Sequence, residues 1–353
     1  MNKIFIVNFL RNMEDINKKR NIGGAKFDRD LLIIFENLGF TLKLLPMISK
    51  KDKIITFFKM IYEFFSHKRD IYFFRYPLIY LGTRIDFINI LLEKILYKIM
   101  NMSGNKIAII ISDLDFIRYK GFNQKSINQE IGFLNNFDYI IAHNDEMIRL
   151  LLNNGVDKNK LINQEVGNNL SDYKLKEKKL SRTVVFSGNL SKSVFLNELA
   201  KTKLSYTLNL YGIGYFIKDK SSFLNYKGNF STEDIVKSME GSWGLIWDGN
   251  SINDCLGNYG EYTRINNPSK FSQYIAAGLP VIAWKKAAIA GVIEKYNIGF
   301  LVNNLMEIGD ILDTMTQNKY QIYIDNVRIL RNKVITGYHI KKAINKILMM
   351  ERK

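Results

Sequence analysis

A chain of 353 residues with 47% hydrophobic residues is long enough for two α/β domains and too apolar to be disordered. Its formal net charge of +17 suits acidic ligands such as nucleotide diphosphates or an anionic membrane surface, but the basic residues form no tail or block typical of a nucleic-acid-binding protein. We therefore expect no bound nucleic acid. The one cysteine, Cys255, cannot form an internal disulfide, and no apolar run reaches the 18 or so residues of a membrane span, so we expect a cytoplasmic protein.

Strands and helices alternate through the first half of the chain. Short apolar runs predict strands at residues 3–9, 40–45, 70–76, 106–111 and 138–142. Apolar residues at helical spacing predict helices at about 27–38, 50–69, 83–100 and 144–153. This alternation indicates one doubly wound, Rossmann-like domain over residues 1–168.

Two adjacent glycines, Gly23 and Gly24, stand between the first expected strand and the first expected helix. Glycines at such a junction let backbone N–H groups approach a phosphate or a sugar closely, so both are candidates for the donor site. The segment contains neither GxGxxG nor a Walker lysine pattern, and a plain turn is the alternative.

The expected helix at 50–69 has basic ends and an aromatic face. Apolar residues recur at helical spacing at Phe57, Phe58, Ile61, Phe64 and Phe65. Such a pattern is typical of helices that lie on anionic membranes, and it equally fits a helix packed on the sheet with its lysines in water. Peripheral contact with the inner face of the cell membrane is therefore a hypothesis.

Polar side chains follow two expected strands of the first domain. Asp113 and Asp115 come directly after the strand at 106–111, and His143 follows the strand at 138–142. Ligands of open α/β sheets bind outside the carboxyl ends of strands, so these side chains are candidates for chemistry. Asp113 could instead cap the next turn.

The alternation resumes after residues 169–183, a polar and charged segment that we interpret as an interdomain linker. Strands are expected at 182–187, 206–211 and 243–248, within a second Rossmann-like domain over 184–336. The remaining residues, 337–353, predict a helix that crosses back to the first domain. The expected architecture is α/β, with two doubly wound domains that face a cleft.

The stretch NNPSKFSQYIAAGLPVIAW at 266–284 predicts a helix followed by a buried strand. Pro268 suits the first turn of this helix with Asn267 as its cap, and Gly278 ends it. Ser269 and Lys270 then stand at a helix start, where free N–H groups and the helix dipole favour anions.

Motifs along the whole chain resemble one family. The matching segments, in order, are GGAK, FFRYPL, SDLDFIR, YIIAHNDEM, FSGNLSKSVFL, LYGIG, WGLIWDG, NNPSKFSQYIAAGLPVI and IGF. Together they resemble the bacterial glucosyltransferases that extend the O-glycan of serine-rich adhesins, and the related β-1,6-galactofuranosyltransferases of surface polysaccharide assembly. The resemblance implies the GT-B fold and the transfer of a hexose from a UDP-sugar to a saccharide acceptor.

The resemblance also implies which residues hold the donor. Lys192 and Lys270 are expected at the diphosphate, where a cation stabilises the leaving phosphate without a metal ion. Tyr211 and Gly212 match the place where uracil packs, although Tyr211 could simply be a core residue at a strand end. The expected donor-binding set is Gly23, Gly24, Asn189, Lys192, Tyr211, Gly212, Asn266, Asn267, Ser269 and Lys270.

The chain departs from related patterns at several positions. The resemblance implies an inverting transfer, and Ile265 and Gln273, which stand where many retaining GT-B enzymes carry two glutamates, argue against a retaining enzyme. Such a transfer needs a base near the acceptor hydroxyl, for which Asp113 is the first candidate and Asp115, Asp28 and His143 are rivals. On the expected acceptor side, Ser112 and Arg75 stand where the family usually has other residues. The identity of the acceptor is therefore the property that can least be carried over from the family to this chain.

Two other functions remain open on the sequence. A non-hydrolysing sugar-nucleotide epimerase shares the two-domain layout, and a non-catalytic partner subunit of a transferase would share the fold and nucleotide binding. We expect neither a metal site nor a cofactor besides the UDP-sugar donor. We also expect a homo-oligomer that acts on a lipid-linked or peptide-linked saccharide. The sequence does not identify the transferred hexose.

Overall fold

The computed structural model describes residues 1–9, 23–46, 50–77, 87–217 and 221–352. These divide into two compact units. The first unit holds the described residues within Met1–Lys19, Phe27–Gln164 and Lys341–Lys353, and the second holds those within Arg20–Lys26 and Glu165–Ile340.

Among the described residues, the first unit contains a parallel sheet in the order β2-β1-β3-β4-β5-β6. Its strands are β1 (Lys3–Val7), β2 (Thr41–Leu44), β3 (Ile71–Tyr76), β4 (Lys106–Ile111), β5 (Tyr139–Ala142) and β6 (Leu161–Asn163). Its helices are α2 (Gly23–Asn37), α3 (Lys50–Ser66), α4 (Phe87–Met102), α5 (Asp115–Lys120), α6 (Gln124–Leu134) and α7 (Asp145–Asn153). The five strands expected from the sequence are all present.

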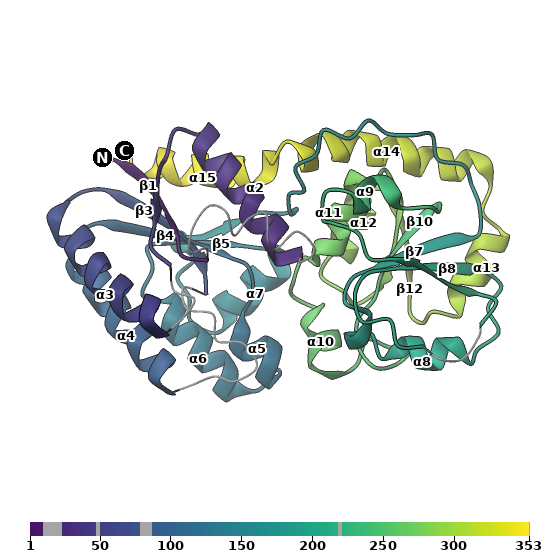
Figure 1. Ribbon diagram of the computed structural model, residues 1–353, viewed down its shortest axis with the longest axis horizontal. Coiled ribbons are helices and arrows are strands. Elements are labelled where there is room, and N and C mark those ends of the chain that lie inside the picture. Colours follow the sequence, from purple (N-terminus) through teal and green to yellow (C-terminus); the bar gives the residue numbers. More distant parts are fainter. Residues whose placement is uncertain (10–22, 47–49, 78–86, 218–220, 353) are drawn as a thin grey trace. The chain divides into compact units, whose positions relative to one another are not determined.

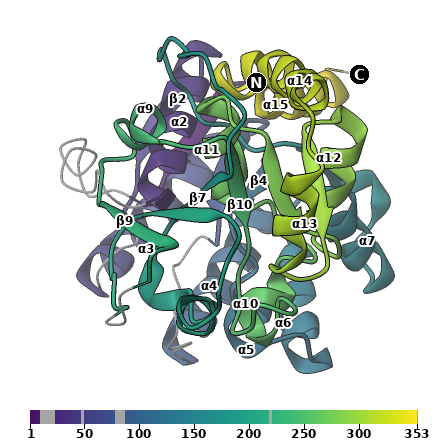
Figure 2. The ribbon, with the colours of Figure 1, turned by 90° about the vertical axis from the view of Figure 1, so that its right-hand side faces the viewer.

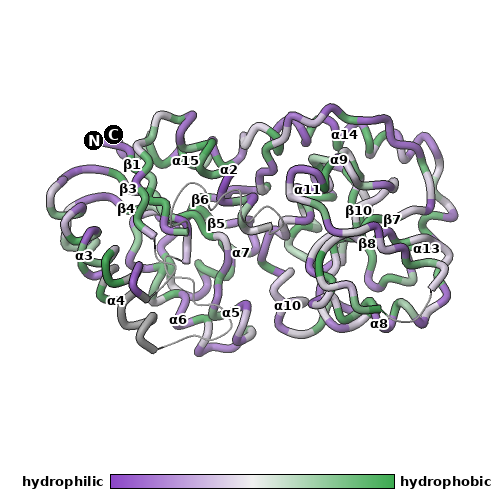
Figure 3. Tube along the Cα trace, viewed as in Figure 1, coloured by the Kyte–Doolittle hydropathy of each residue, from purple (hydrophilic) through white to green (hydrophobic). Residues whose placement is uncertain are grey.

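Helices cover both faces of this sheet (Figure 1), with α2 and the C-terminal helix α15 (Tyr338–Met350) on one face and α3, α4 and α6 on the other. The strands of a sheet covered on both faces are almost entirely apolar, and Figure 3 shows the hydrophobic strands inside their more polar helices. Aromatic rings fill the contact between α2 and the strands, where Phe35 stacks on Phe5 with ring centroids 4.1 Å apart. Residues from Lys341 onward belong to this unit, and Glu351 accepts a hydrogen bond from the Tyr139 hydroxyl.

The second unit repeats this architecture, with a parallel sheet in the order β12-β11-β10-β7-β8-β9 among its described residues. Its strands are β7 (Thr183–Ser187), β8 (Thr207–Tyr211), β9 (Leu224–Gly228), β10 (Trp243–Ile246), β11 (Val281–Trp284) and β12 (Gly299–Val302). Its helices are α8 (Phe195–Ala200), α9 (Ile235–Ser238), α10 (Gly257–Tyr262), α11 (Ser269–Ala276), α12 (Ala290–Tyr296), α13 (Glu307–Asp313) and α14 (Gln317–Ile335). On one face α11 and α12 pack against α14, and α8 lies on the other (Figures 1 and 2).

The strand order of each sheet reverses at one point, and this point positions a ligand. In the second unit the chain runs outward from β7 through β8 to β9, and then outward in the other direction from β10 to β12. In the first unit the reversal lies between β1 and β3. Open α/β sheets bind ligands in the crevice outside the carboxyl ends of the two strands that flank such a reversal.

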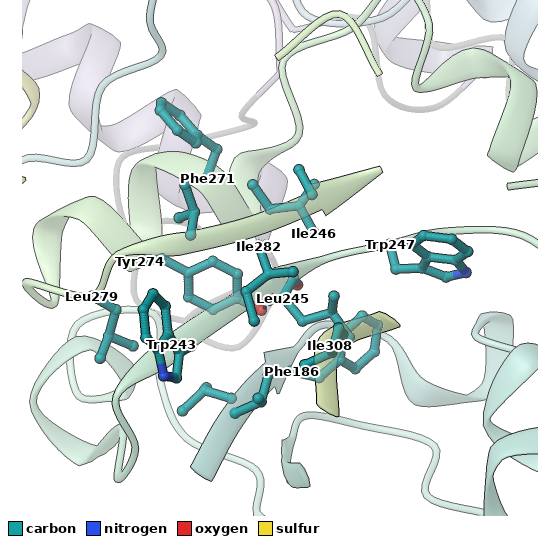
Figure 4. Packing of buried hydrophobic residues seen from close by; sticks show 14 of the residues in the cluster. Phe186, Trp243, Leu245, Ile246, Trp247, Phe271, Tyr274, Leu279, Ile282 and Ile308 are labelled. Carbon is teal, nitrogen blue, oxygen red and sulfur yellow. Dashed lines mark hydrogen bonds between the residues drawn. The ribbon is translucent and has the colours of Figure 1, made fainter. Parts of the chain in front are cut away.

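Tyr274 on α11 fills the interior beside the reversal in the second unit (Figure 4). Its hydroxyl accepts a hydrogen bond from the Ser187 amide at 2.9 Å and donates one to the Leu245 carbonyl at 3.1 Å, which ties α11 to both flanking strands. A Cβ atom at Gly244 would lie 2.3 Å from this ring, so glycine is required for the helix to approach β10 this closely. The same contact places the start of α11 beside the strand ends.

Residues 165–182, all of which the structure describes, contain neither helix nor strand and belong to the second unit. The Lys178 ammonium donates to the Met239 carbonyl at 3.1 Å, and Arg331 on α14 donates to the Tyr173 carbonyl. No helix within the described ranges has the length and apolar character needed to cross a bilayer.

Candidate functional site

The start of α11 differs from the expected geometry in one respect. The helix begins at Ser269, so Pro268 precedes the first turn instead of belonging to it, and Asn267 does not cap the helix. The Asn267 amide donates to the Glu165 carbonyl at 3.2 Å. Proline has no polar side-chain atom that could accept a hydrogen bond from the first N–H groups of α11. These N–H groups lie beside the exposed Ser269 and beside Lys270, where another partner could bind them.

Lys270 lies at the reversal point of the second sheet. Its ammonium donates to the Trp247 carbonyl and to both carboxylate oxygens of Asp248, each at 2.9 Å. The same group lies 4.7 Å from the centroid of the Phe186 ring. Lys270 is thus held at the carboxyl ends of β7 and β10, where the topology places a ligand, with a carboxylate as its present counterion.

Two glycine turns pack directly on each other at the ends of β7 and β8. Gly212 adopts φ +134° and would place a Cβ atom 1.8 Å from the Gly188 carbonyl oxygen. The Leu190 amide donates to the Ile213 carbonyl at 2.8 Å, which joins the two turns. Gly212 is therefore required by backbone packing, whether or not the same backbone also faces a nucleotide.

Asn189 and Lys192 lie in the turn after β7, within the short helix η2 (Leu190–Lys192) and its cap. The Asn189 side chain accepts hydrogen bonds from the Ser191 amide at 3.1 Å and the Ser191 hydroxyl at 2.7 Å, so it shapes the turn. Lys192 is exposed, with its ammonium 5.3 Å from the ring centroid of Tyr259 on α10. An exposed cation beside an aromatic ring at a strand end suits an anionic ligand.

The Tyr211 side chain is a core residue and is only 1% exposed. Its hydroxyl donates to the Ser238 carbonyl at 3.2 Å and accepts from the Glu240 amide at 2.9 Å. A ring held in this way offers no face to a base, which corrects the expectation that uracil packs against Tyr211.

The remaining donor candidates lie in two places. Gly23 and Gly24 form the first turn of α2, which begins four residues before the expected start, and this turn belongs to the second unit. Asn266 follows α10, and its side-chain oxygen is buried without a hydrogen-bond partner within the described part of the chain. Gln273, at one of the positions that would hold a glutamate in a retaining enzyme, accepts a hydrogen bond from the Ser187 hydroxyl at 2.6 Å.

In the first unit, Asp113 lies beyond the carboxyl end of β4 and forms an ion pair with Arg118 one turn into α5. Leu114, not Asp113, is the residue that precedes α5. The alternative in which Asp113 caps the next turn is therefore wrong. Its carboxylate is about a quarter exposed, whereas Asp115 is only 2% exposed.

His143 is buried beside Asp113, and its Nε2 atom lies 2.9 Å from the Ile111 carbonyl oxygen. Burial lowers the pKa of His143 from its ordinary value, against the charge of Asp113, which acts to raise it. The ring is therefore neutral near pH 7. Because a nitrogen that faces a carbonyl oxygen carries the proton, Nδ1 is the unprotonated nitrogen of this tautomer.

The reversal point of the first sheet holds a second polar cluster. The Asn8 amide follows β1 and donates to the Arg75 carbonyl on β3 at 3.4 Å. Asp28 on α2 is 9% exposed and pairs with the Arg75 guanidinium, Nε to Oδ1 at 3.3 Å. Of the rival bases, Asp28 is thus the one nearest the position that the topology favours.

The sequence did not identify two residues of this site. Asp248 lies two residues after the end of β10, as Asp113 lies two residues after β4, so the rule applied to Asp113 would also have found it. Tyr259 lies on α10, a helix that the sequence did not predict. Cys255 is buried, and burial raises the pKa of its thiol, so it has no thiolate character. Among the described residues no group of three or more His, Cys, Asp or Glu side chains could hold a metal ion.

Comparison with known proteins gives a match for both halves of the chain. Residues 7–166 match the N-terminal domain model of the Glucosyltransferase 3-like family, and residues 184–347 match its C-terminal domain model. The β-1,6-galactofuranosyltransferase WbbI of Escherichia coli is 30% identical over 253 residues, which cover 69% of this chain and 71% of the relative. Glucosyltransferase 3 of Streptococcus gordonii is 24% identical over 240 residues, covering 68% and 70%. The resemblance expected from the motifs is confirmed.

Solved structures of low sequence identity share the fold. The Anabaena protein HepE, solved in complex with UDP-glucose, superposes with a TM-score of 0.58 at 12% identity and covers 99% of this chain and 100% of its own. Sucrose-phosphate synthase from Thermosynechococcus elongatus gives a TM-score of 0.64 at 11% identity, with 99% of each chain covered. These likenesses, together with the two doubly wound sheets, confirm the expected GT-B fold.

Proposed function

The chain belongs to the Glucosyltransferase 3-like family, and on that premise we propose that it transfers a hexose from a UDP-sugar to a saccharide acceptor, with inversion and without a metal ion. Hexosyl transfer follows from the relatives, which are named as glucosyl- and galactofuranosyltransferases. UDP as the nucleotide is supported by HepE, the structural neighbour solved with UDP-glucose. Inversion is supported by Ile265 and Gln273, which stand where a retaining enzyme would carry glutamates.

The observation that carries this proposal is the position of Lys270 at the reversal point of the second sheet. A leaving UDP gains negative charge on its β-phosphate as the glycosidic bond breaks. A lysine at the start of a helix stabilises that charge more in the transition state than in the bound donor, which lowers the barrier. We assign this role to Lys270 and a supporting contact to the exposed Lys192.

The acceptor is assigned to the first unit, where the base must remove a proton from the attacking hydroxyl. We keep Asp113 in this role because it combines a position at a strand end with partial exposure. Asp28 is the first rival because it lies near the reversal point. Asp115 is a weaker candidate because its side chain is buried. The neutral His143 beside Asp113 could pass the proton on.

The test has two stages. UDP should raise the melting temperature of the purified protein, because a ligand that binds only the folded state stabilises it. Screening UDP-glucose, UDP-galactose, UDP-galactofuranose and UDP-N-acetylglucosamine for donor hydrolysis, and then for transfer to saccharide acceptors, identifies the hexose. If neither UDP nor any sugar nucleotide raised the melting temperature, the proposal would be contradicted.

The same assay separates the two alternatives. An epimerase would convert the donor sugar without an acceptor, and product analysis would reveal it. A partner subunit would bind UDP without turnover and restore activity to another transferase. We further propose that the enzyme is a cytoplasmic homo-oligomer and that its acceptor is a lipid-linked or peptide-linked saccharide. A lipid-linked acceptor would be presented at the inner face of the membrane.

A further inference from the structure

Helix α3 of the first unit is apolar on two faces, and only one of them is used by the fold. Thr56, Met60 and Phe64 recur every four residues, and each is at most 1% exposed. The Phe64 ring packs against Tyr72 on β3, with centroids 4.8 Å apart. This inward face attaches α3 to the sheet. Packing on the sheet is one of the two alternatives that the sequence left open for this helix, the other being contact with a membrane.

The outward face is the unexplained part. Five large apolar side chains lie on it in water, with exposed fractions of 57% for Ile54, 44% for Ile55, 64% for Phe58, 74% for Tyr62 and 47% for Phe65. At 100° per residue, the five positions fall within one ~100° stripe along the helix. We call these five side chains the α3 outer face. Single exposed apolar residues are ordinary, but a continuous stripe of this kind marks an interaction site.

Basic groups lie on and beside the α3 outer face. Lys51 and Lys59 are exposed on the same half of the helix, and Lys68 and Arg69 are exposed just beyond its end. The two acidic residues of α3 do not cancel this charge. The Glu63 carboxylate is engaged by Lys43 and by the Tyr72 hydroxyl, and Asp52 supplies one negative charge against these four positive ones. The surface therefore combines aromatic and aliphatic side chains with positive charge.

This chemistry fits a lipid surface better than a second copy of the chain. Two copies joined through this face would bring Lys51 and Lys59 of one against those of the other, on proteins that each carry a net charge of +17. One helical stripe is also narrow beside the ~800 Å² per partner of a typical stable interface. Helices with Phe, Tyr and Ile on one side and Lys flanking them lie in the headgroup region of anionic bilayers.

We propose that the α3 outer face docks the protein on a membrane leaflet that contains anionic phospholipid, with the helix lying parallel to the surface. The aromatic and aliphatic side chains enter the interfacial region, and Lys51 and Lys59 contact lipid phosphates. This docking does not depend on the transfer reaction, so it stands or falls separately from the proposed function.

Vesicle flotation tests the proposal without donor or acceptor. The full chain should float with vesicles of phosphatidylcholine and phosphatidylglycerol, and at least about tenfold less with phosphatidylcholine alone or at high salt. The double variant Phe58→Gln/Tyr62→Gln should lose binding about tenfold, and so should Lys51→Glu/Lys59→Glu. Because all four side chains are exposed, the melting temperature of both variants should stay at the parent value.

The matched control is Ile322→Gln/Ile329→Gln, which replaces two side chains that are 52% and 61% exposed on α14. It should float like the parent. The proposal is overturned if the parent does not float with anionic vesicles, or if the control loses binding as much as the α3 variants. It is equally overturned if the α3 variants float normally but abolish a concentration-dependent dimer, since the occupant would then be a second copy.

Discussion

The ammonium group of Lys270 lies 2.9 Å from each carboxylate oxygen of Asp248, and these contacts together with the one to Trp247 use all three of its N–H donors. A diphosphate that binds Lys270 must displace at least one of them. Asp248 is therefore a built-in counterion: it positions the lysine, and its negative charge opposes the binding of an anionic ligand there.

Substitution at this pair should have opposite effects on UDP affinity. Lys270→Met should weaken UDP binding by about tenfold or more, because a charge-assisted hydrogen bond is worth about 1.5–3 kcal/mol. Asp248→Asn should tighten it by roughly threefold to tenfold, since the competing charge is removed. Calorimetric titration with UDP measures both.

The control for this pair is Lys203→Met, which removes an exposed lysine ahead of β8, at the other end of the strands. Its UDP affinity should equal that of the parent. If Asp248→Asn weakened UDP binding as much as Lys270→Met, Asp248 would be needed to position the lysine and would not compete with the ligand.

The paired turns predict a backbone requirement. Gly212→Ala should lower the stability of the second unit by about 1–3 kcal/mol from the unfavourable φ alone, and by more because the new Cβ atom would meet the Gly188 carbonyl. Gly291→Ala on α12 is the control, because no atom lies within 4 Å of its Cβ position and alanine favours a helix. Calorimetric unfolding that showed equal melting temperatures for Gly212→Ala and the parent would contradict this prediction.

The buried parallel strands could be predicted because a sheet covered on both faces requires uninterrupted apolar runs, such as the IAIII that follows Lys106 in β4. The strand β9 was missed because it is at the sheet edge and three of its five residues are exposed. The helix α10 was missed because GNYGEY contains two glycines, which disfavour helices.

The same burial explains the error at Tyr211. In β8 four consecutive side chains are buried, so no alternation indicates whether the last one points into the core or toward a ligand. The pairing of Lys270 with Asp248 joins residues 22 positions apart through the contact of α11 with β10. Sequence spacing alone does not reveal such a contact, although each residue can be found separately by its position at a helix start or beyond a strand end.

Asp113 gives a prediction about turnover. Asp113→Asn should lower kcat by about 10²–10⁴-fold, the usual contribution of a general base, and leave UDP binding unchanged. Asp138→Asn is the matched control, because Asp138 lies at the amino end of β5 and accepts a hydrogen bond from the Ile107 amide at 2.9 Å. It should affect stability and not kcat. Loss of turnover in Asp28→Asn but not in Asp113→Asn would move the base to the reversal point between β1 and β3.

Glu165 predicts a pH-dependent contribution to stability. One of its oxygens accepts hydrogen bonds from Lys295 and from the Tyr296 hydroxyl at 3.0 Å, and the other lies 3.4 Å from Nδ1 of His339. Burial acts to raise the pKa of Glu165, but these hydrogen bonds and the charge of His339 outweigh it and lower the pKa from its usual 4.5. A carboxyl group whose pKa is lower in the folded state stabilises the fold above the unfolded pKa, and this stabilisation is lost as the pH falls through the folded pKa.

Glu165→Gln should therefore melt at a lower temperature than the parent at pH 7, and the difference should shrink as the pH is lowered below 4.5. Glu294→Gln, which removes the same charge from an exposed position on α12, should show a much smaller difference at every pH. Melting curves of the three proteins between pH 3 and pH 8 measure the effect. A difference between Glu165→Gln and the parent that persisted undiminished at pH 3 would mean that the side chain acts through packing, because the protonated carboxyl group and the amide are then both uncharged.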